Sequence, residues 1–324
     1  MSRTFPEIQR RVEAAEAVLV LSHDRPDGDA IGSMVALGMI LEDFGKRVRL
    51  LNNDAVPESL RFLPGADRVE RPGDPVEADL VFALDSAGRD RIDESVWEVT
   101  PDGVPLVVVD HHISNDGFGD ISHVDAESPA TGQILFELAR SCGWRVSREA
   151  AINLYAAIST DTGSFRYPST TAHTMRVGSE LISLGVDVGW TNRMIYENQP
   201  RRRVEILRRL LDDLRFDCDE RCASVALPLE VTEELHLQPG DTEGVIDILR
   251  SVDSVIIAAF FEELPDGRIR VSSRSKREDC GVGEICSQFG GGGHTLAAGA
   301  RLPGPLEEAR NRFMRAVGVT LSRI

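Results

Sequence analysis

Residues 17–32 read AVLVLSHDRPDGDAIG, and this stretch decides the fold. The run 17–21 is continuously apolar, as expected for a parallel strand that is covered on both faces. A polar, acidic segment follows it. Apolar residues then recur at helical spacing over 30–44, with Gly45 as the expected C-terminal cap. A strand that passes through a polar loop into a helix is the opening unit of an open α/β sheet.

Further apolar runs extend this pattern through the first half of the chain. Strands are expected at 48–51, 80–84 and 106–109. Helical spacing predicts helices near 131–142, 148–158 and 172–184. The alternation predicts an α/β fold with a doubly wound, mostly parallel sheet.

The pattern of alternating apolar strands and helices changes after Pro200. Residues 200–214 include five arginines and predict a charged connecting helix. Strands are expected beyond it at 223–227, 255–261 and 268–272, with helices near 242–250 and 306–317. We therefore predict a first domain at 1–196, a helical linker at 197–214 and a smaller C-terminal α/β domain at 215–324.

The composition of the 324 residues excludes several classes of protein. The 42% of hydrophobic and 27% of charged residues are typical of a globular protein, and no apolar run approaches the ~20 residues of a membrane span. Five cysteines without a CxxC pair argue against a disulfide framework and a zinc ribbon. Acidic residues near the N-terminus argue against a secretory signal. We expect a cytoplasmic protein that binds no membrane. Its net charge of −17 argues against long nucleic acid as a partner.

Acidic residues and histidines gather where the predicted strands end. They are His23, Asp27 and Asp29 after 17–21, Asp85 after 80–84, Asp110, His111 and His112 after 106–109, and Asp161 after the helix 148–158. Since parallel strands deliver their carboxyl ends to one edge of the sheet, these side chains should converge there. Mixed imidazole and carboxylate ligands suit Mn²⁺ better than Mg²⁺. The set is large enough for two ions about 3.5–4 Å apart, an arrangement that supports displacement at phosphorus.

Each of these residues has an ordinary structural alternative. An aspartate at a strand end is usually a turn residue or a helix cap, and Asp29 could act only as a cap before Ala30. His111 could be a hydrogen-bonded structural histidine. The conjunction favours a metal centre, because several desolvated carboxylates at one edge repel one another without cations.

The first-domain motifs, SHDRPDGDAIGS at 22–33 with Asp110-His111-His112 and Asp161, resemble the DHH phosphoesterase superfamily. The segment FGGGGHTLAAG at 289–299 resembles the signature of the DHHA1 domain. Together the motifs cover essentially the whole chain. The length and two-domain layout are most similar to the bifunctional oligoribonuclease and phosphoadenosine-phosphate phosphatase group.

This resemblance implies a two-metal site in the cleft between the domains, with Mn²⁺ as the expected ion and Mg²⁺ or Co²⁺ as alternatives. It implies His23, Asp27 and Asp85 as ligands of one ion. It implies Asp29, Asp85, His111 and Asp161 as ligands of the other, with Asp85 bridging. Two neighbours are expected to be catalytic. Asp110 would orient a histidine through its second nitrogen, and His112 would contact the scissile phosphate and protonate the leaving group.

The second domain is expected to bind the substrate. The glycine run before His294 leaves backbone N–H groups free to bind a phosphate. The Ala-rich residues after it predict the start of a helix or of a strand, and a helix could add its dipole. We expect the substrate-binding residues to be Arg274, Gly291, Gly292, Gly293 and His294. The alternatives are a flexible linker for the glycine run and a solvated basic turn for Arg274.

The leading hypothesis is a metal-dependent phosphohydrolase. Its expected substrates are short RNA from di- to pentanucleotides, linear dinucleotides and 3′-phosphoadenosine 5′-phosphate (PAP), and the resemblance allows a homodimer. An inorganic pyrophosphatase or short-chain polyphosphatase of the same superfamily is the alternative enzyme. A nucleotide-sensing module without turnover is the alternative outside enzymes, although no ligand position is substituted here.

Overall fold

The computed structural model describes residues 4–238 and 240–323. These residues form two compact units that divide between residues 198 and 199. The first unit is built on a six-stranded sheet in the order β3-β2-β1-β4-β5-β6, in which every pair of neighbours is parallel. The strands are β1 (Ala17–Ser22), β2 (Arg47–Leu51), β3 (Val69–Glu70), β4 (Leu80–Leu84), β5 (Leu106–Asp110) and β6 (Ile121–Val124).

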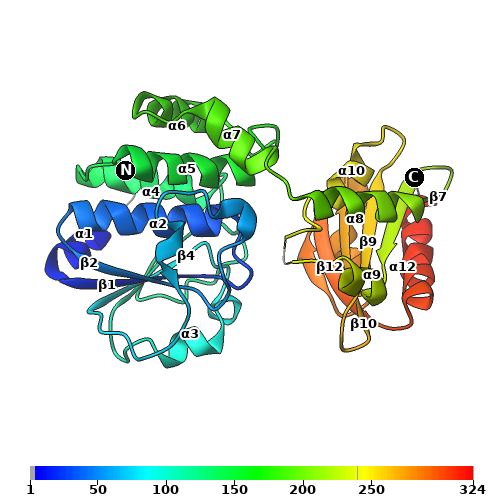
Figure 1. Ribbon diagram of the computed structural model, residues 1–324, viewed down its shortest axis with the longest axis horizontal. Helices are drawn as coiled ribbons and strands as arrows, with labels where there is room; N and C mark the ends of the chain where they lie inside the picture. Colours follow the sequence, from blue (N-terminus) through cyan, green and yellow to red (C-terminus); the bar gives the residue numbers. More distant parts are fainter. Residues whose placement is uncertain (1–3, 239, 324) are drawn as a thin grey trace. The chain divides into compact units, whose positions relative to one another are not determined.

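Helices cover both faces of this sheet (Figure 1). The helices of this unit are α1 (Phe5–Ala14), α2 (Gly28–Asp43), α3 (Glu94–Glu98), α4 (Thr131–Cys142), α5 (Arg148–Asp161), α6 (Ala172–Ser183) and α7 (Val188–Tyr196). Helices α6 and α7 pack against α5 rather than against the sheet. Alternate residues of the strands face opposite layers. Val20 and Phe82 pack in the core with α2, α4 and α5, whereas Leu21 and Ala83 pack with α3. The expected doubly wound α/β architecture is confirmed, and the sheet is entirely parallel.

Helix α2 begins two residues earlier than the apolar spacing predicts. The Asp27 carboxylate accepts hydrogen bonds from the backbone N–H groups of Asp29 and Ala30, at 3.0 and 3.1 Å. Asp27 is therefore the helix cap, and the structural alternative in which Asp29 caps this helix is wrong. Helix α5 likewise continues past residue 158, so Asp161 is its last residue rather than part of the following loop.

The second unit is built on a mixed sheet in the order β11-β12-β10-β9-β8-β7, in which only the β8–β9 pair is parallel among the described strands. Its strands are β7 (Arg215–Asp217), β8 (Cys222–Leu227), β9 (Ile257–Glu263), β10 (Arg268–Ser275), β11 (Gly292–His294) and β12 (Ala297–Pro303). Its helices are α8 (Arg201–Asp212), α9 (Leu229–Glu234), α10 (Val245–Ser251), α11 (Val282–Ser287) and α12 (Leu306–Leu321).

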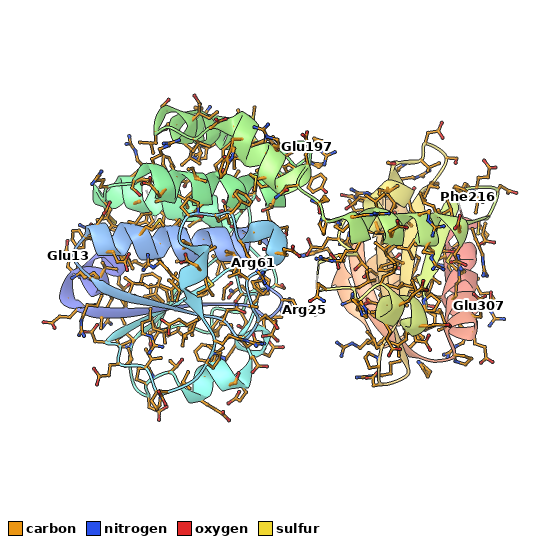
Figure 2. The ribbon with its side chains drawn as sticks, viewed as in Figure 1. Glu13, Arg25, Arg61, Glu197, Phe216 and Glu307 are labelled. Carbon is orange, nitrogen blue, oxygen red and sulfur yellow. The ribbon has the colours of Figure 1, made fainter. Side chains whose placement is uncertain are left out.

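Helix α8, which the sequence suggests as a connector, packs into this second unit. Ile206 and Leu210 lie in one core cluster with residues of β8 and β9. On the other face of the sheet, α11 and α12 cover a second core. The first turn of α12 is linked to β7, since Arg215 donates to both carboxylate oxygens of Glu307 at 2.9 Å. Figure 2 labels Glu307 on this helix.

The glycine run does not open a helix. Gly292 and Gly293 lie in β11, which pairs with β12 in an antiparallel hairpin. Of the two structures that the sequence allows after this run, a helix or a strand, the protein has a strand, so no helix dipole contributes and any anion would meet strand backbone there. Within residues 4–238 and 240–323, no helix is both long and apolar enough to cross a membrane.

Candidate metal centre

The candidate centre lies at the carboxyl edge of the first sheet, where three neighbouring strands end. His23 follows β1, Asp85 follows β4, and His111 follows β5. Strands β1 and β4 are the neighbours between which the strand order reverses, the position where open α/β sheets bind ligands. Asp85 adopts a left-handed φ of 54°, a strained conformation that turns the chain directly at the strand end.

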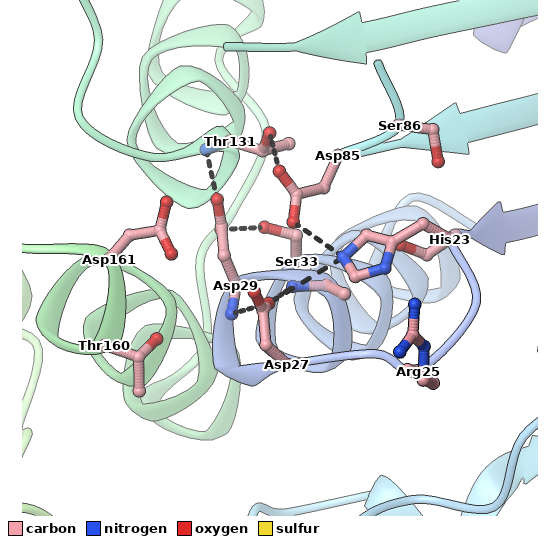
Figure 3. Close-up of polar contacts among 12 residues, drawn as sticks. His23, Arg25, Asp27, Asp29, Ser33, Asp85, Ser86, Thr131, Thr160 and Asp161 are labelled. Atoms are coloured by element: carbon pink, nitrogen blue, oxygen red, sulfur yellow. Dashed lines mark hydrogen bonds and ion pairs between the residues drawn. The ribbon is translucent and has the colours of Figure 1, made fainter. Parts of the chain in front are cut away.

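One half of the centre is formed by His23, Asp27 and Asp85 (Figure 3). The His23 Nε2 atom lies 3.5 Å from Asp85 Oδ2 and 4.0 Å from Asp27 Oδ1. The other ring nitrogen, Nδ1, lies 2.8 Å from the carbonyl oxygen of Asp24, which can only accept a hydrogen bond. His23 is thus oriented with Nε2 toward the two carboxylates, as histidine ligands of metals are.

The other half is formed around His111. Its Nε2 atom lies 3.2 Å from Asp161 Oδ2, 3.4 Å from Asp85 Oδ1 and 3.8 Å from Asp29 Oδ2. Asp29 and Asp85 are almost fully buried, with 0% and 2% of their surface exposed. Asp85 therefore presents one carboxylate oxygen to each histidine and joins the two halves.

The structure brings the six predicted ligands together at this edge. Candidate ligand atoms within 4.8 Å of one another form three groups: His23, Asp27 and Asp85; Asp29, His111 and Asp161; and Asp85, His111 and His112. The donors are nitrogens and carboxylate oxygens, the set that Mn²⁺ accepts. These residues fit a pair of divalent ions.

The electrostatics of the centre show why cations fit it. Burial and the negative charges of Asp85 and Asp161 raise the pKa of Asp29 well above its usual value. Burial by itself would lower the pKa of His23, but its hydrogen bond and charge interaction with Asp85 outweigh this and raise it to about 9. Burial would also raise the pKa of Asp85, yet hydrogen bonds from His111 and His23 lower it. The carboxylates thus repel one another and depend on positive charge nearby.

His112 stands apart from the other histidines through its partner. Its Nδ1 atom lies 2.7 Å from Asp110 Oδ1, and a carboxylate accepts, so Nδ1 carries the proton and Nε2 stays available. The second Asp110 oxygen accepts from the Asn115 amide at 2.7 Å. Asp110 is completely buried. This chain of hydrogen bonds fixes the orientation of the His112 ring.

Several residues that position the ligands are not predicted from the sequence. The Asp29 carboxylate accepts from the Ser33 hydroxyl and from the backbone N–H groups of Thr131 and Gly132 (Figure 3). The amide of the buried Asn52 donates to the carbonyl oxygens of Ser22 and His23. The contact of Ser33 with Asp29 could have been predicted, because residues four apart in a helix lie on one face. The contacts of Thr131 span 102 residues and left no local signal.

The predicted substrate-binding residues all belong to the second unit. Arg274 pairs with Ala297 across β10 and β12, and Ala297 pairs with His294 across β12 and β11. Directly opposed residues point to the same face of a sheet, so Arg274 and His294 share a face with only an alanine between them. Arg274 also donates to the Ser273 carbonyl oxygen at 3.2 Å.

The structure requires glycine for different reasons at three of the four positions before His294. A Cβ atom at Gly291 would lie 2.1 Å from the Gly299 carbonyl oxygen, and one at Gly293 would lie 2.6 Å from that of Ala297. Both therefore allow the close approach of β12. Gly290 has a φ of 72°, which favours glycine in the turn. At Gly292 a Cβ would meet nothing within 4 Å, so packing leaves this glycine unexplained.

Two family models match separate parts of the chain. Residues 17–158 match the model of the DHH family, N-terminal domain, and residues 226–322 match that of the DHHA1 domain. A bifunctional oligoribonuclease and PAP phosphatase from Thermus thermophilus is 32% identical over 99% of this chain and 94% of its own. A probable enzyme of the same name from Streptococcus mutans is 31% identical over 91% of this chain and 93% of its own.

A solved structure, that of an exopolyphosphatase-related protein from Bacteroides fragilis, is similar throughout. It has a TM-score of 0.90 and 27% identity, covering 98% of this chain and 97% of the other. Fold, ligand geometry and relatives agree. The chain belongs to the DHH/DHHA1 phosphoesterase family, in the group whose curated members are named bifunctional oligoribonuclease and PAP phosphatase, and it is a hydrolase.

Proposed function

We propose that this protein is a Mn²⁺-dependent phosphohydrolase that cleaves short RNA and linear dinucleotides to mononucleotides and removes a phosphate from PAP. The observation that carries the proposal is the shared Asp85 carboxylate, whose two oxygens face His23 and His111 separately. A carboxylate placed between two histidines in this way is suited to bridge two ions.

The ligands are assigned by these two halves. His23, Asp27 and Asp85 would hold one ion, and Asp29, Asp85, His111 and Asp161 the other. A bound pair of divalent ions supplies an activated water and stabilises the attacking and leaving oxygens of an in-line displacement. The protein contributes the fixed spacing of the ligands. His23, Asp85 and His111 follow strand ends, whereas Asp27 and Asp29 belong to the start of α2 and Asp161 to the end of α5.

His112 is suited to act as the general acid. With Nδ1 donating to Asp110, a protonated ring holds its second proton on Nε2. Burial would lower the pKa of His112, but the hydrogen bond to Asp110 and the charge of Asp85 outweigh it and raise the pKa. A protonated His112 ring could donate its Nε2 proton to the leaving oxygen.

The second unit is proposed to bind the phosphates of the substrate. Arg274 supplies a guanidinium that can contact a phosphate through two nitrogens, and His294 points to the same face of the sheet. The exposed backbone of Gly292 offers an approach that no side chain obstructs. The names of the relatives specify oligoribonucleotides and PAP, and the net charge of −17 favours short substrates over long nucleic acid.

A panel of substrates tests this proposal. Purified protein with Mn²⁺, Mg²⁺ or Co²⁺ is given di- to pentanucleotides, PAP and pyrophosphate, and the products are separated by chromatography. We expect mononucleotides from the short RNA, AMP from PAP, the fastest turnover with Mn²⁺, and no turnover in EDTA. Turnover of none of the nucleotides in any of the three ions would contradict the proposal.

A second candidate is a short-chain polyphosphatase. It is favoured by the similarity to the exopolyphosphatase-related protein, which extends over both units. Tripolyphosphate in the same panel separates the two activities. Hydrolysis of tripolyphosphate at least as fast as that of a dinucleotide would favour this second function.

A further inference from the structure

Helix α4 begins with a residue that contacts both buried carboxylates of the centre. Its N-cap residue is Ala130, whose methyl side chain cannot accept a hydrogen bond from the first N–H groups of the helix. The Asp29 carboxylate, on helix α2, accepts from the backbone nitrogens of Thr131 at 2.6 Å and Gly132 at 2.9 Å instead. Asp29 therefore caps α4 from a distant part of the chain.

Thr131 also makes a second contact. Its hydroxyl group donates to Asp85 Oδ1 over 3.1 Å, and its side chain is completely buried (Figure 3). One residue thus holds two carboxylates with two donors, the backbone nitrogen for Asp29 and Oγ1 for Asp85. The helix fixes the first donor, and the branched side chain has few rotamers for the second.

The two oxygens that Thr131 contacts face the same histidine. Asp29 Oδ2 and Asp85 Oδ1 lie 3.8 and 3.4 Å from His111 Nε2. The other Asp85 oxygen, which faces His23, receives no bond from Thr131. Each contacted oxygen still has a lone pair for a cation, because a carboxylate offers about four acceptor sites.

We propose that Thr131 is a positioning residue, which sets the separation of Asp29 and Asp85 and thereby builds the His111 half of the metal centre while leaving the His23 half largely independent. The inference rests on the proposed two-metal function. Loss of such a supporting hydrogen bond typically weakens a metal site by about tenfold to a hundredfold.

The test compares the full chain with Thr131→Val, which removes the hydroxyl group but keeps the shape, and Thr131→Ser, which restores it. Mn²⁺ binding is followed by calorimetry and by electron paramagnetic resonance, which distinguishes a spin-coupled pair from isolated ions. Thr191→Val is the matched control, because Thr191 is a fully buried threonine of the same unit on α7.

We expect wild type, Thr131→Ser and Thr191→Val to bind two Mn²⁺ as a coupled pair. Thr131→Val should keep one site and bind the second ion about tenfold to a hundredfold more weakly, with the spectrum of an isolated ion at low Mn²⁺. Circular dichroism verifies the fold, and Thr131→Ala is used in the same way if the valine variant does not fold.

Unchanged binding of both ions by folded Thr131→Val would overturn the inference, and so would equal weakening of both sites. Failure of Thr131→Ser to restore the pair would also overturn it, because the hydroxyl group would then not be the cause. If the wild type itself binds no coupled pair of Mn²⁺ ions, the proposed two-metal function is contradicted, whatever the variants do. Mn²⁺ binding by the wild type therefore distinguishes a failure of the proposed function from a failure of the inference about Thr131.

Discussion

The carboxyl edge of the first sheet and the strand β11 of the second unit hold their functional groups in opposite ways. At the first edge, Asp29, Asp85 and Asp110 are buried and each is held by hydrogen bonds from other segments. In β11, Gly292, Gly293 and His294 are exposed, and two of the three are glycines. Under the proposed function, buried side chains would prearrange the chemistry at the first edge, and accessible backbone in β11 would bind the substrate.

The largest effect is expected from Asp85→Ala. Removing the carboxylate that faces both histidines should lower kcat by at least about a thousandfold, more than the loss of one stabilising donor. Dinucleotide turnover with Mn²⁺ measures it, and Asp102→Ala, in an exposed loop of the same unit, is the control. Substantial activity in Asp85→Ala would remove the basis for calling this edge the catalytic region.

A smaller effect of a different kind is expected from Arg274→Ala. If the second unit mainly binds phosphate, KM should rise by about tenfold to a hundredfold, as for a lost charged hydrogen bond, while kcat changes less. Arg268→Ala is the matched control, because Arg268 is on the same strand and its side chain pairs with Asp266 at 2.6 Å. A fall in kcat at constant KM would place Arg274 in the chemical step and break the comparison.

Much of this contrast could be predicted from the sequence, because strand ends and ligand types are local features. The motif from His23 to Asp29 follows an apolar strand directly, so its position at the sheet edge was predictable. The role of Thr131 was not, since its partners lie 46 and 102 residues away along the chain. The glycine run left a helix or a strand open, because flexible residues suit both a phosphate loop and a close strand pair.

Two neighbouring glycines sharpen the comparison within the second unit. Gly291→Ala should lower the free energy of unfolding by about 1–3 kcal/mol, because its Cβ would collide with the Gly299 carbonyl oxygen. Gly292→Ala has open space and should change stability by less than about 0.5 kcal/mol, yet raise KM if backbone there contacts phosphate. Thermal unfolding and kinetics measure the pair. Equal loss of stability in both would show that β11 is a packing element rather than a binding one.

The smallest expected effect is a dependence of the stability of the first unit on pH. His123 in the first unit packs its ring 4.7 Å from that of Phe5, and burial lowers the pKa of His123. The unfolded chain therefore binds this proton more tightly, so stability should fall as pH drops below about 6.5. Fluorescence of the tryptophans, all three of which lie in the first unit, follows its unfolding in urea.

His123→Gln should reduce this loss of stability on acidification, whereas Gln at the exposed His173 should leave it intact. An unchanged acid sensitivity in His123→Gln would assign the effect to other groups of the unit.

The central claim, that side chains of the first sheet edge hold a pair of divalent ions, is tested most directly by anomalous X-ray diffraction from crystals grown with Mn²⁺. We predict two manganese peaks, one bounded by His23, Asp27 and Asp85 and the other by Asp29, Asp85, His111 and Asp161. A single peak, or none among these residues at saturating Mn²⁺, would contradict the account.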